Sequence, residues 1–183
     1  MAFNYGATGF TFPGAGGALG FGAVRLVRGN AYAGSTRFTF ETISYGVDAA
    51  NNIAVDSLTG LKWRRCSEGQ NWNGTNCVGE ATSFDLFSAL AHAKLKDGWR
   101  LPDIRELSSI HDKSERAPAI NPVVFPDVFV GANVRLSSYW SSSPSPFSGT
   151  SGDHWYVQFN NERQVVGTNW QLMDALWKLR LVR

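Results

Sequence analysis

The fold is decided most strongly by one stretch, Trp99-Arg100-Leu101-Pro102-Asp103-Ile104-Arg105-Glu106-Leu107. Proline favours the first turn of a helix, because its fixed φ is helical and the N–H that it lacks would have no partner there. After Pro102, the apolar residues Ile104, Leu107 and Ile110 recur at helical spacing. The stretch therefore predicts a helix that starts at Pro102 and buries one face against a core.

The charged pair within this stretch, Arg100 and Glu106, is compatible with catalysis in principle. A buried Arg–carboxylate pair that ties the helix to a sheet is the simpler interpretation, because the guanidinium matches a carboxylate in a bidentate geometry. Large aromatic and aliphatic residues at such spacings are core material far more often than ligand platforms. The core is therefore expected to contain Trp99, Leu101, Leu107, Trp140, Trp155 and Phe159.

A further helix is predicted upstream. Thr82 or Ser83 can cap it, and Asp85 falls in its first turn, where a carboxylate is favourable. Apolar residues then recur at helical spacing until a glycine ends the pattern. These residues are Phe84, Phe87, Ala91, Leu95 and Gly98.

Strands are predicted on both sides of the helices. Residues 52–55 and 61–64 flank a turn with Asp and Gly at its ends, which is typical of strand, turn, strand. Near the end of the chain, apolar residues alternate with polar ones, as in half-buried strands. They are Trp155, Val157 and Phe159, then Trp177, Leu179 and Leu181. Helices in the first half and strands in the second indicate an α+β domain.

Composition bounds the class of protein. The 183 residues suit one domain plus a fragment, and a net charge of +2 does not by itself imply nucleic acid. Residues 1–24 carry no charge, but no basic region precedes them and seven glycines interrupt them. They therefore fit neither a signal peptide nor a membrane span, and we expect any export signal to lie outside this chain.

The two ends of the chain carry a repeated pattern. Phe3-Asn4 precedes a Leu26-Val27-Arg28 ending, and Phe159-Asn160 precedes Leu181-Val182-Arg183, with spans of 28−3 = 25 and 183−159 = 24 positions. Chance is the alternative, but matching ends around a changed middle favour an internal repeat. We therefore divide the chain into a terminal β-segment of an upstream module at 1–28, a linker at 29–37 and a complete domain at 38–183.

The two cysteines, Cys66 and Cys77, lie 77−66 = 11 positions apart in a polar stretch. Free cysteines are usually buried, so a local disulfide formed in an oxidising compartment fits this setting better. A zinc site would need two further ligands at matched spacing, and no histidine lies near in the sequence.

Six ordered motifs together resemble a known bacterial module over residues 45–183. They are Asp56-Ser57-Leu58-Thr59-Gly60-Leu61-Lys62-Trp63, the Trp99–Leu107 stretch, Pro118-Ala119-Ile120 before Phe125-Pro126, Tyr139-Trp140-Ser141-Ser142-Ser143, Trp155-Tyr156-Val157 and the terminal Leu-Val-Arg run. The pattern is similar to the Lcl-type C-terminal domain, the module that ends a bacterial collagen-like adhesin.

This resemblance implies a C-type lectin-like fold, with two helices packed on a twisted antiparallel sheet and the N- and C-terminal strands adjacent. It also implies that the two cysteines match positions that the family often pairs. Residues 3–28 resemble the closing segment of another such domain, so we expect them to pair with a sheet edge, a second chain or upstream sequence. A homo-oligomer or strand exchange through residues 1–28 is one form of this expectation.

The motifs of several enzymes and metal sites are missing. The sequence holds no G-x-S-x-G nucleophile elbow and neither triplet pair of the calcium-dependent lectins. Asp103, Asp127 and Asp174 are isolated carboxylates, whereas a calcium site needs several converging oxygens. We therefore expect no catalytic residue, no cofactor and no metal. An oxidase of the same fold remains an alternative, and it would require reduced Cys66 and Cys77 that bind a metal.

Two surfaces are candidates for binding. The first is the segment that differs between the two repeat copies, over 161–177, which mixes aromatic faces with amide and charged groups. Its candidate residues are Asn161, Arg163, Gln164, Thr168, Asn169, Trp170, Gln171 and Asp174, while Trp177 falls on the apolar face of the last strand. The second is a possible polyanion patch of Lys62, Arg64 and Arg65, for which a solvated strand face is the plainer interpretation.

These observations predict a secreted or cell-surface ligand-binding module without catalysis, which recognises a glycan or a protein through the 161–177 surface. We expect neither nucleic-acid binding nor direct membrane insertion. A variable receptor diversified by a retroelement on the same scaffold is the main alternative, and a purely structural repeat is another.

Overall fold

The computed structural model describes residues 37–43, 50–112, 118–128, 137–145, 154–159, 165–168 and 175–183. The chain divides into two units, and all of these residues belong to the second, Ala33–Arg183. The predicted repeat segment at 1–28 lies outside the described residues, as does the predicted linker up to its last residue. The division of the chain into repeat, linker and domain therefore stays a prediction.

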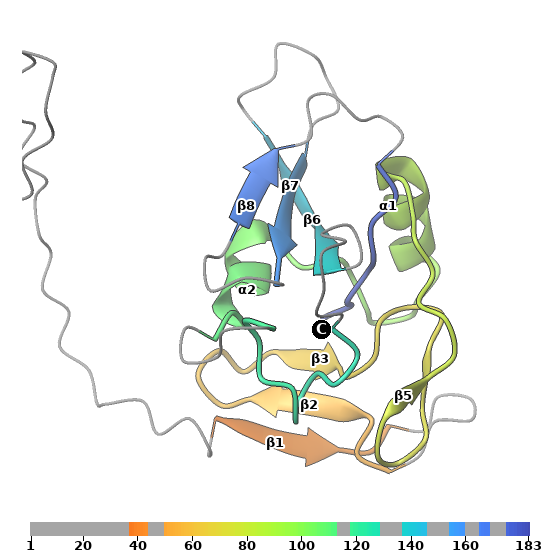
Figure 1. Cartoon of the computed structure of the whole chain (residues 1–183), viewed down its shortest axis with the longest axis vertical. Coiled ribbons are helices and arrows are strands. Elements are labelled where there is room, and N and C mark those ends of the chain that lie inside the picture. Colours follow the sequence, from red (N-terminus) through yellow and green to blue (C-terminus); the bar gives the residue numbers. More distant parts are fainter. Residues whose placement is uncertain are drawn as a thin grey trace, which may run out of the picture. The chain divides into compact units, whose positions relative to one another are not determined.

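The described part of the chain contains two α-helices and eight short strands (Figure 1). The helices are α1, Leu86–Lys94, and α2, Ile104–Ser109. The strands are β1, Phe38–Glu41; β2, Ile53–Asp56; β3, Lys62–Arg64; β4, Asn71–Trp72; β5, Cys77–Val78; β6, Ser138–Pro144; β7, His154–Gln158; and β8, Val165–Thr168. Helices beside antiparallel strands confirm the α+β class.

Helix α2 is the helix that the Trp99–Leu107 stretch predicts, although it begins with Asp103 as its N-cap. The Asp103 carboxylate accepts from the backbone N–H of Glu106, and the Glu106 carboxylate accepts from the backbone N–H of Asp103, each at 2.8 Å. This capping box satisfies N–H groups that a helix start otherwise leaves without partners. Leu107 and Ile110 are buried, as their spacing predicts.

Glu106 also pairs with Arg100, as predicted. The two guanidinium nitrogens of Arg100 donate to the two carboxylate oxygens at 2.6 and 2.7 Å. The pair was expected to be buried, but 51% of the Arg100 side chain is exposed. It is therefore a surface ion pair, of a kind that stabilises a fold by only about 0–1 kcal/mol.

Helix α1 starts later than predicted and buries a different face from the one that its largest apolar residues suggest. Asp85, not Thr82 or Ser83, is the N-cap, and its carboxylate accepts from Ser88 N. Phe87 and Leu95 do share a face, but they are 69% and 82% exposed. The buried residues are Leu86, Ala89 and Ala93, since small alanine side chains let the helix approach the aromatic core closely.

Antiparallel pairing forms separate small sheets among the described residues, with the orders β1-β2-β3, β4-β5 and β6-β7-β8. Ala54 of β2 pairs with Trp63 of β3, and Gly60 supplies the positive φ of the turn between them. The predicted strand, turn, strand at 52–64 is confirmed. The single sheet implied by the resemblance is divided, because the C-terminal segment joins β6 and β3 only through isolated bridges.

This C-terminal segment, residues 175–183, connects the sheets. Its backbone bridges to Phe84, to β6 at Tyr139 and, through Val182, to both β3 and Arg100. Figure 1 accordingly shows the C-terminus beside β3. The resemblance implies that the N- and C-terminal strands are adjacent, but β2 and β3 separate β1 from this segment.

The segment is also more buried than its alternating pattern predicts. Trp177, Leu179 and Leu181 lie in one hydrophobic cluster, as expected. The opposite face is buried as well, although it carries Lys178 and Arg180. The prediction of a half-buried strand is therefore wrong here, because buried acceptors compensate Arg180, as described below.

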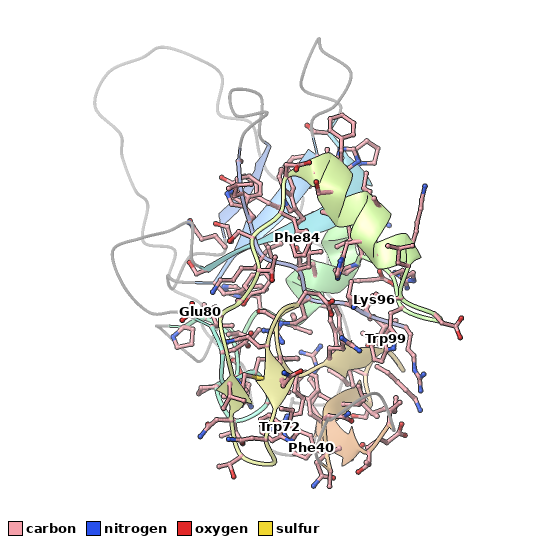
Figure 2. All side chains as sticks on the ribbon, turned by 90° about the vertical axis from the view of Figure 1, so that its right-hand side faces the viewer. Phe40, Trp72, Glu80, Phe84, Lys96 and Trp99 are labelled. Atoms are coloured by element: carbon pink, nitrogen blue, oxygen red, sulfur yellow. A yellow bond between two sulfur atoms is a disulfide. The ribbon has the colours of Figure 1, made fainter. Side chains whose placement is uncertain are left out.

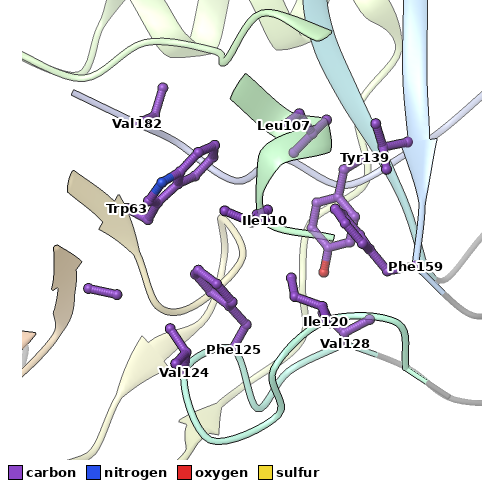
Figure 3. Close-up of a cluster of buried hydrophobic side chains, with 12 residues drawn as sticks. Trp63, Leu107, Ile110, Ile120, Val124, Phe125, Val128, Tyr139, Phe159 and Val182 are labelled. Carbon is purple, nitrogen blue, oxygen red and sulfur yellow. The ribbon is translucent and has the colours of Figure 1, made fainter. Parts of the chain in front are cut away.

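Two hydrophobic clusters lie on opposite faces of β2 and β3. Ala54 and Trp63 belong to the first cluster, whereas Ile53 belongs to the second, as strand alternation requires. Leu181 of the C-terminal segment also belongs to the second cluster. Figure 3 shows the first cluster, in which side chains from β3, α2, residues 118–128 and β6 converge. Of the predicted core residues, Trp99, Leu101, Leu107, Trp140 and Phe159 are buried and Trp155 is half-buried.

Candidate functional site

Strand β3 has one apolar and one basic face. Trp63 is fully buried in the first cluster, so it is the inward residue of the strand. Lys62 and Arg64 project from the other face, because successive side chains of a strand alternate. The same face of the sheet is covered at one end by α1 and the second hydrophobic cluster. The basic side chains therefore lie at the end of this face that α1 and the second cluster leave uncovered.

The C-terminal segment adds a further cation to this face. The backbone N–H of Lys62 donates to Arg183 O at 2.9 Å, and the N–H of Arg183 donates to Lys62 O at 3.0 Å. Two residues that exchange both bonds are direct cross-strand neighbours, with their side chains on the same face. The exposed Arg183 side chain therefore lies next to Lys62.

Trp99 forms the apolar base on which two of these cations rest. The guanidinium of Arg64 lies 5.3 Å from the centre of the Trp99 ring, and that of Arg183 lies 5.1 Å from it. Cations are attracted to the face of an indole at such distances. Trp99 itself is only 6% exposed, so it orients the two arginines more than it offers a surface of its own. The backbone N–H of Trp99 donates to Lys96 O at 2.9 Å, so Lys96 lies near Trp99 just after the end of α1 (Figure 2).

A single buried carboxylate, Glu68, joins three of the basic side chains. Its oxygens lie 2.7 Å from Arg64 Nη1, 2.6 Å from His92 Nε2 and 3.4 Å from Lys96 Nζ. The Glu68 side chain is 3% exposed, whereas those of Arg64, Lys96 and His92 are 16%, 23% and 27% exposed. The basic groups thus cover the acid and stand between it and the solvent.

The environment of Glu68 favours its charged form. Burial by itself raises the pKa of this carboxyl. The hydrogen bond with His92 and the charges of Arg64 and Lys96 together lower the pKa by more than burial raises it, so the net pKa is below the ordinary value. With Glu68 ionised, the permanent charges of Arg64 and Lys96 leave the group with an excess of one positive charge.

Lys62 has its own carboxylate partner at the sheet surface. Its Nζ lies 2.5 Å from Glu41 Oε2, across β2. Both side chains are substantially exposed, 33% for Lys62 and 44% for Glu41, so water competes for this pair. We call the surface formed by Lys62, Arg64, Lys96 and Arg183 the basic face.

Arg65 was predicted to belong with Lys62 and Arg64, and the structure separates it from them. Arg65 lies just beyond the end of β3 and is 6% exposed. Its guanidinium stacks on Phe40 at 4.2 Å and on Trp72 at 3.8 Å, two residues that lie close together in Figure 2. Burial lowers the Arg65 pKa to about 10. Its nitrogens donate to the backbone oxygens of Asn51, Val123 and Val124.

A second charged cluster is fully buried. Arg180 and Asp127 form an ion pair in which both side chains are 0% exposed. Asp127 also accepts from the backbone N–H and the hydroxyl of Ser67. The Ser67 hydroxyl lies 3.0 Å from the Tyr139 hydroxyl, and burial raises the Tyr139 pKa to about 12. Because no solvent reaches this cluster, its role is to hold the C-terminal segment in place.

A further set of backbone acceptors completes that anchor. Arg180 Nη1 donates to Arg64 O at 2.9 Å and to Arg65 O at 2.6 Å. The end of β3 is thereby fastened to the C-terminal segment from the buried side. The positions of Arg64 and Arg183 on the basic face therefore depend on a cation that is itself out of reach of any ligand.

Comparison with known protein families provides the identification. The model of the Lcl C-terminal domain matches residues 52–183, which is more than half of the chain. The chain belongs to the Lcl C-terminal domain family. Comparisons with curated proteins and with solved structures found no match. The matched range contains the whole C-terminal segment and both helices, whereas β1 precedes it.

The disulfide expected for this Lcl domain is present. Cys66 and Cys77 are bonded, with their Cα atoms 5.5 Å apart. The bond closes the loop that contains β4 and starts directly before Ser67 and Glu68. The disulfide is thus adjacent in sequence to both charged clusters. Ser67 belongs to the Arg180–Asp127 cluster, and Glu68 is the acid of the other.

The 161–177 surface of the Lcl domain is largely outside the described residues. That holds for Asn161, Arg163, Gln164, Asn169, Trp170, Gln171 and Asp174. Thr168 ends β8, where it pairs with Trp155 of β7. Trp177 is 5% exposed and packs against Trp140 and Tyr156, which confirms its place in the core.

Sequence reasoning missed that Lys96 and Arg183 share the basic face with Lys62 and Arg64. It also missed the buried Glu68 and its contact with His92. Strand alternation in the sequence places Lys62 with Arg64, and Leu181 with Arg183, but the pairing of these two strands has no local signal. Within the described ranges, no three metal-ligating side chains come together. Neither described helix is long and apolar enough to cross a bilayer.

Proposed function

We propose that this Lcl domain is a non-catalytic ligand-binding module whose basic face recognises a polyanionic chain such as a sulfated polysaccharide. The observation that carries the proposal is the arrangement of Lys62, Arg64, Lys96 and Arg183 around Trp99, with the acid Glu68 buried beneath. Cations collected on one surface raise the local concentration of anionic ligands and speed their association.

The chemistry of the side chains suits sulfate groups. A guanidinium presents several N–H donors in a plane and is weakly hydrated, so it exchanges water for an anionic oxygen readily. Arg64 and Arg183 are held against Trp99, so less side-chain freedom is lost when they engage a ligand. Because the face is open to solvent, we expect affinity that decreases steeply as salt is added.

Two finer assignments belong to the same proposal. The C-type lectin-like fold rests on the motif resemblance, together with the two helices and antiparallel sheets of the described residues. A secreted or cell-surface location is supported by the Cys66–Cys77 disulfide, because such bonds persist in oxidising compartments. Both are consistent with an adhesion module that meets sulfated or otherwise acidic glycans outside the cell.

The test is a comparison of two exposed arginines. Arg183→Ala removes one positive charge from the basic face, and Arg105→Ala removes the same charge from α2. We expect Arg183→Ala to weaken binding of a heparin oligosaccharide by about three- to tenfold, because each close charge contact contributes on the order of 1 kcal/mol. The Arg105→Ala control should bind within about twofold of wild type, since α2 contributes no residue to the basic face and salt screens an exposed charge. Equal effects of the two variants would contradict a localised site.

The second candidate is recognition through the 161–177 surface. It is favoured by the mixture of Trp170 with amide and charged residues, which suits sugars and protein epitopes alike. A double variant, Trp170→Ala with Arg163→Ala, separates the two candidates on a glycan array. Loss of binding in this variant would move the site to the 161–177 surface. Retained binding that salt abolishes would support the basic face.

A diversified receptor is distinguished at the level of the gene. In that case the encoding locus should contain a near-copy of the 159–183 coding segment that differs mainly at adenines. A locus without such a copy would remove this alternative and leave the adhesion module.

A further inference from the structure

The basic face contains an acid whose presence needs a reason. Glu68 lies within 3.4 Å of three basic groups that belong to different elements: Arg64 on β3, His92 in α1 and Lys96 just after α1. A surface that only needed positive charge would bind polyanions better without a carboxylate. The acid is also almost completely buried, so it contributes little to the surface that a ligand meets.

The contacts of Glu68 fix the orientations of the basic side chains around it. One carboxylate oxygen accepts from Arg64 and the other from His92, while Lys96 approaches that second oxygen. Trp99 then supports the Arg64 guanidinium from a different side. Long cationic side chains have many rotamers, and a ligand that must immobilise them binds more weakly than one that meets them already placed.

We propose that Glu68 is a positioning residue of the basic face, and that its negative charge strengthens polyanion binding by holding Arg64, Lys96 and His92 toward the ligand. The proposal rests on the function proposed above for this face. Charge counting alone predicts that removal of an acid strengthens the binding of an anion. The positioning role predicts the opposite, that removal of Glu68 weakens it.

The chain offers a matched acid with the opposite role. Glu41 pairs with Lys62 on the same face, but it is 44% exposed, and Lys62 is its one basic partner within the part of the chain that the structure describes. It competes with a ligand for that lysine and contacts no other cation of the described residues. Glu41→Gln and Glu68→Gln each add one unit of positive net charge. Charge counting predicts the same effect for both, whereas positioning predicts opposite effects.

The experiment measures the affinity of the whole 183-residue chain for a heparin oligosaccharide of defined length. We expect Glu68→Gln to bind about three- to tenfold more weakly than wild type, because two cations lose their fixed orientation. We expect Glu41→Gln to bind about two- to threefold more tightly, because Lys62 is released from its partner. A third variant, Glu68→Asp, keeps the charge but shortens the side chain by one methylene, and it should also bind more weakly.

The salt dependence supplies a readout that a loss of stability alone does not change. The slope of log Kd against log salt concentration counts the cations that a polyanion engages, through release of its counterions. We expect this slope to decrease by about one to two in Glu68→Gln and to stay the same or increase in Glu41→Gln. Near-UV circular dichroism confirms that each variant is folded, and if Glu68→Gln does not fold, Glu68→Asp decides.

The outcomes separate this inference from the proposed function. If Glu68→Gln tightens binding as Glu41→Gln does, and Glu68→Asp equals wild type, the positioning role is wrong while the basic face remains the site. If wild type shows no salt-sensitive binding to heparin, the proposed function fails and the inference fails with it. Weaker binding and a smaller slope in the Glu68 variants, with tighter binding in Glu41→Gln, would support both.

Discussion

The Arg180–Asp127 cluster and the Glu68 cluster use the same chemistry for different ends. In the first, both charged side chains are 0% exposed; Asp127 also accepts from Ser67, and Arg180 Nη1 donates to two backbone oxygens. In the second, only the acid is buried, and its basic partners are 16% to 27% exposed. The first cluster can only stabilise the fold, whereas the second presents charge to the solvent.

The difference shows how solvent access decides what an ion pair can do. A buried pair loses the hydration of both ions, so either partner left alone is very unfavourable. A half-exposed cation keeps part of its hydration and can exchange one anionic partner for another at little expense. Ser67 and Glu68 are consecutive residues, yet they belong to different clusters. Ser67 donates to Asp127, whereas Glu68 contacts Arg64 and His92.

The largest expected effect comes from removal of the acid of the buried cluster, and removal of Glu68 provides the comparison. Asp127→Asn should lower the free energy of unfolding by about 3–5 kcal/mol, because it leaves the Arg180 charge buried without a counterion. Glu68→Gln should lower it by only about 1–2 kcal/mol, since its basic partners reach water. Urea unfolding of the two variants beside wild type measures both values. Equal losses would show that burial does not separate the clusters.

The disulfide is expected to have an intermediate effect, because it adjoins both clusters. Replacement of Cys66 and Cys77 by serine should lower the free energy of unfolding by about 2–3 kcal/mol, from the chain entropy regained by a short loop. Reduction of the wild-type protein with a thiol, followed by the same urea titration, is the control and should give a similar loss. If the loss exceeded that of Asp127→Asn, the bond would hold more than its own loop.

The smallest effect is the pH dependence that Glu68 contributes. Its pKa in the folded protein is below the ordinary value, so the unfolded chain takes up a proton first as the pH falls. The stabilisation is therefore fully present above the unfolded pKa, about 4.3, and is lost as the pH falls through the lower folded value. The difference between wild type and Glu68→Gln should shrink from about 1–2 kcal/mol at pH 7 toward zero near pH 2.

This prediction is checked by urea unfolding of both proteins at pH 7, 5 and 3. The wild-type curve should fall more steeply below pH 4 than that of the variant. Parallel curves would mean that Glu68 is no better stabilised in the folded protein than in the unfolded chain. Asp56 has a lowered pKa as well, and because it is present in both proteins its contribution cancels in the comparison.

Much of the local structure follows from the sequence. Pro102 with the spacing of Leu107 and Ile110 locates α2, and the Asp–Gly turn locates β2 and β3. The polar setting of the cysteines predicts their bond. These features depend on neighbours within a few residues, so the information lies within each segment. The prediction failed for α1, where Phe87 and Leu95 suggest a buried stripe and the alanines form it instead.

The basic face and its buried anchor were decided by tertiary structure. The sequence places Lys62 and Arg64 on one side of a strand and shows that Leu181 and Arg183 alternate with Val182. It does not contain the register that brings Arg183 beside Lys62, because strand pairing between distant segments depends on the whole core.

Glu68 illustrates the same limit for a charged residue. Glu68 lies in the polar loop between the two cysteines, and the sequence gives no sign of its burial, which comes from the approach of His92 in α1 and Lys96 just after it. The sequence alone therefore determined the family, the place of α2, the β2–β3 pair and the disulfide. The fold determined which cations share a surface and which carboxylate is buried beneath them, because distance and burial are properties of packed elements and not of the segments that form them.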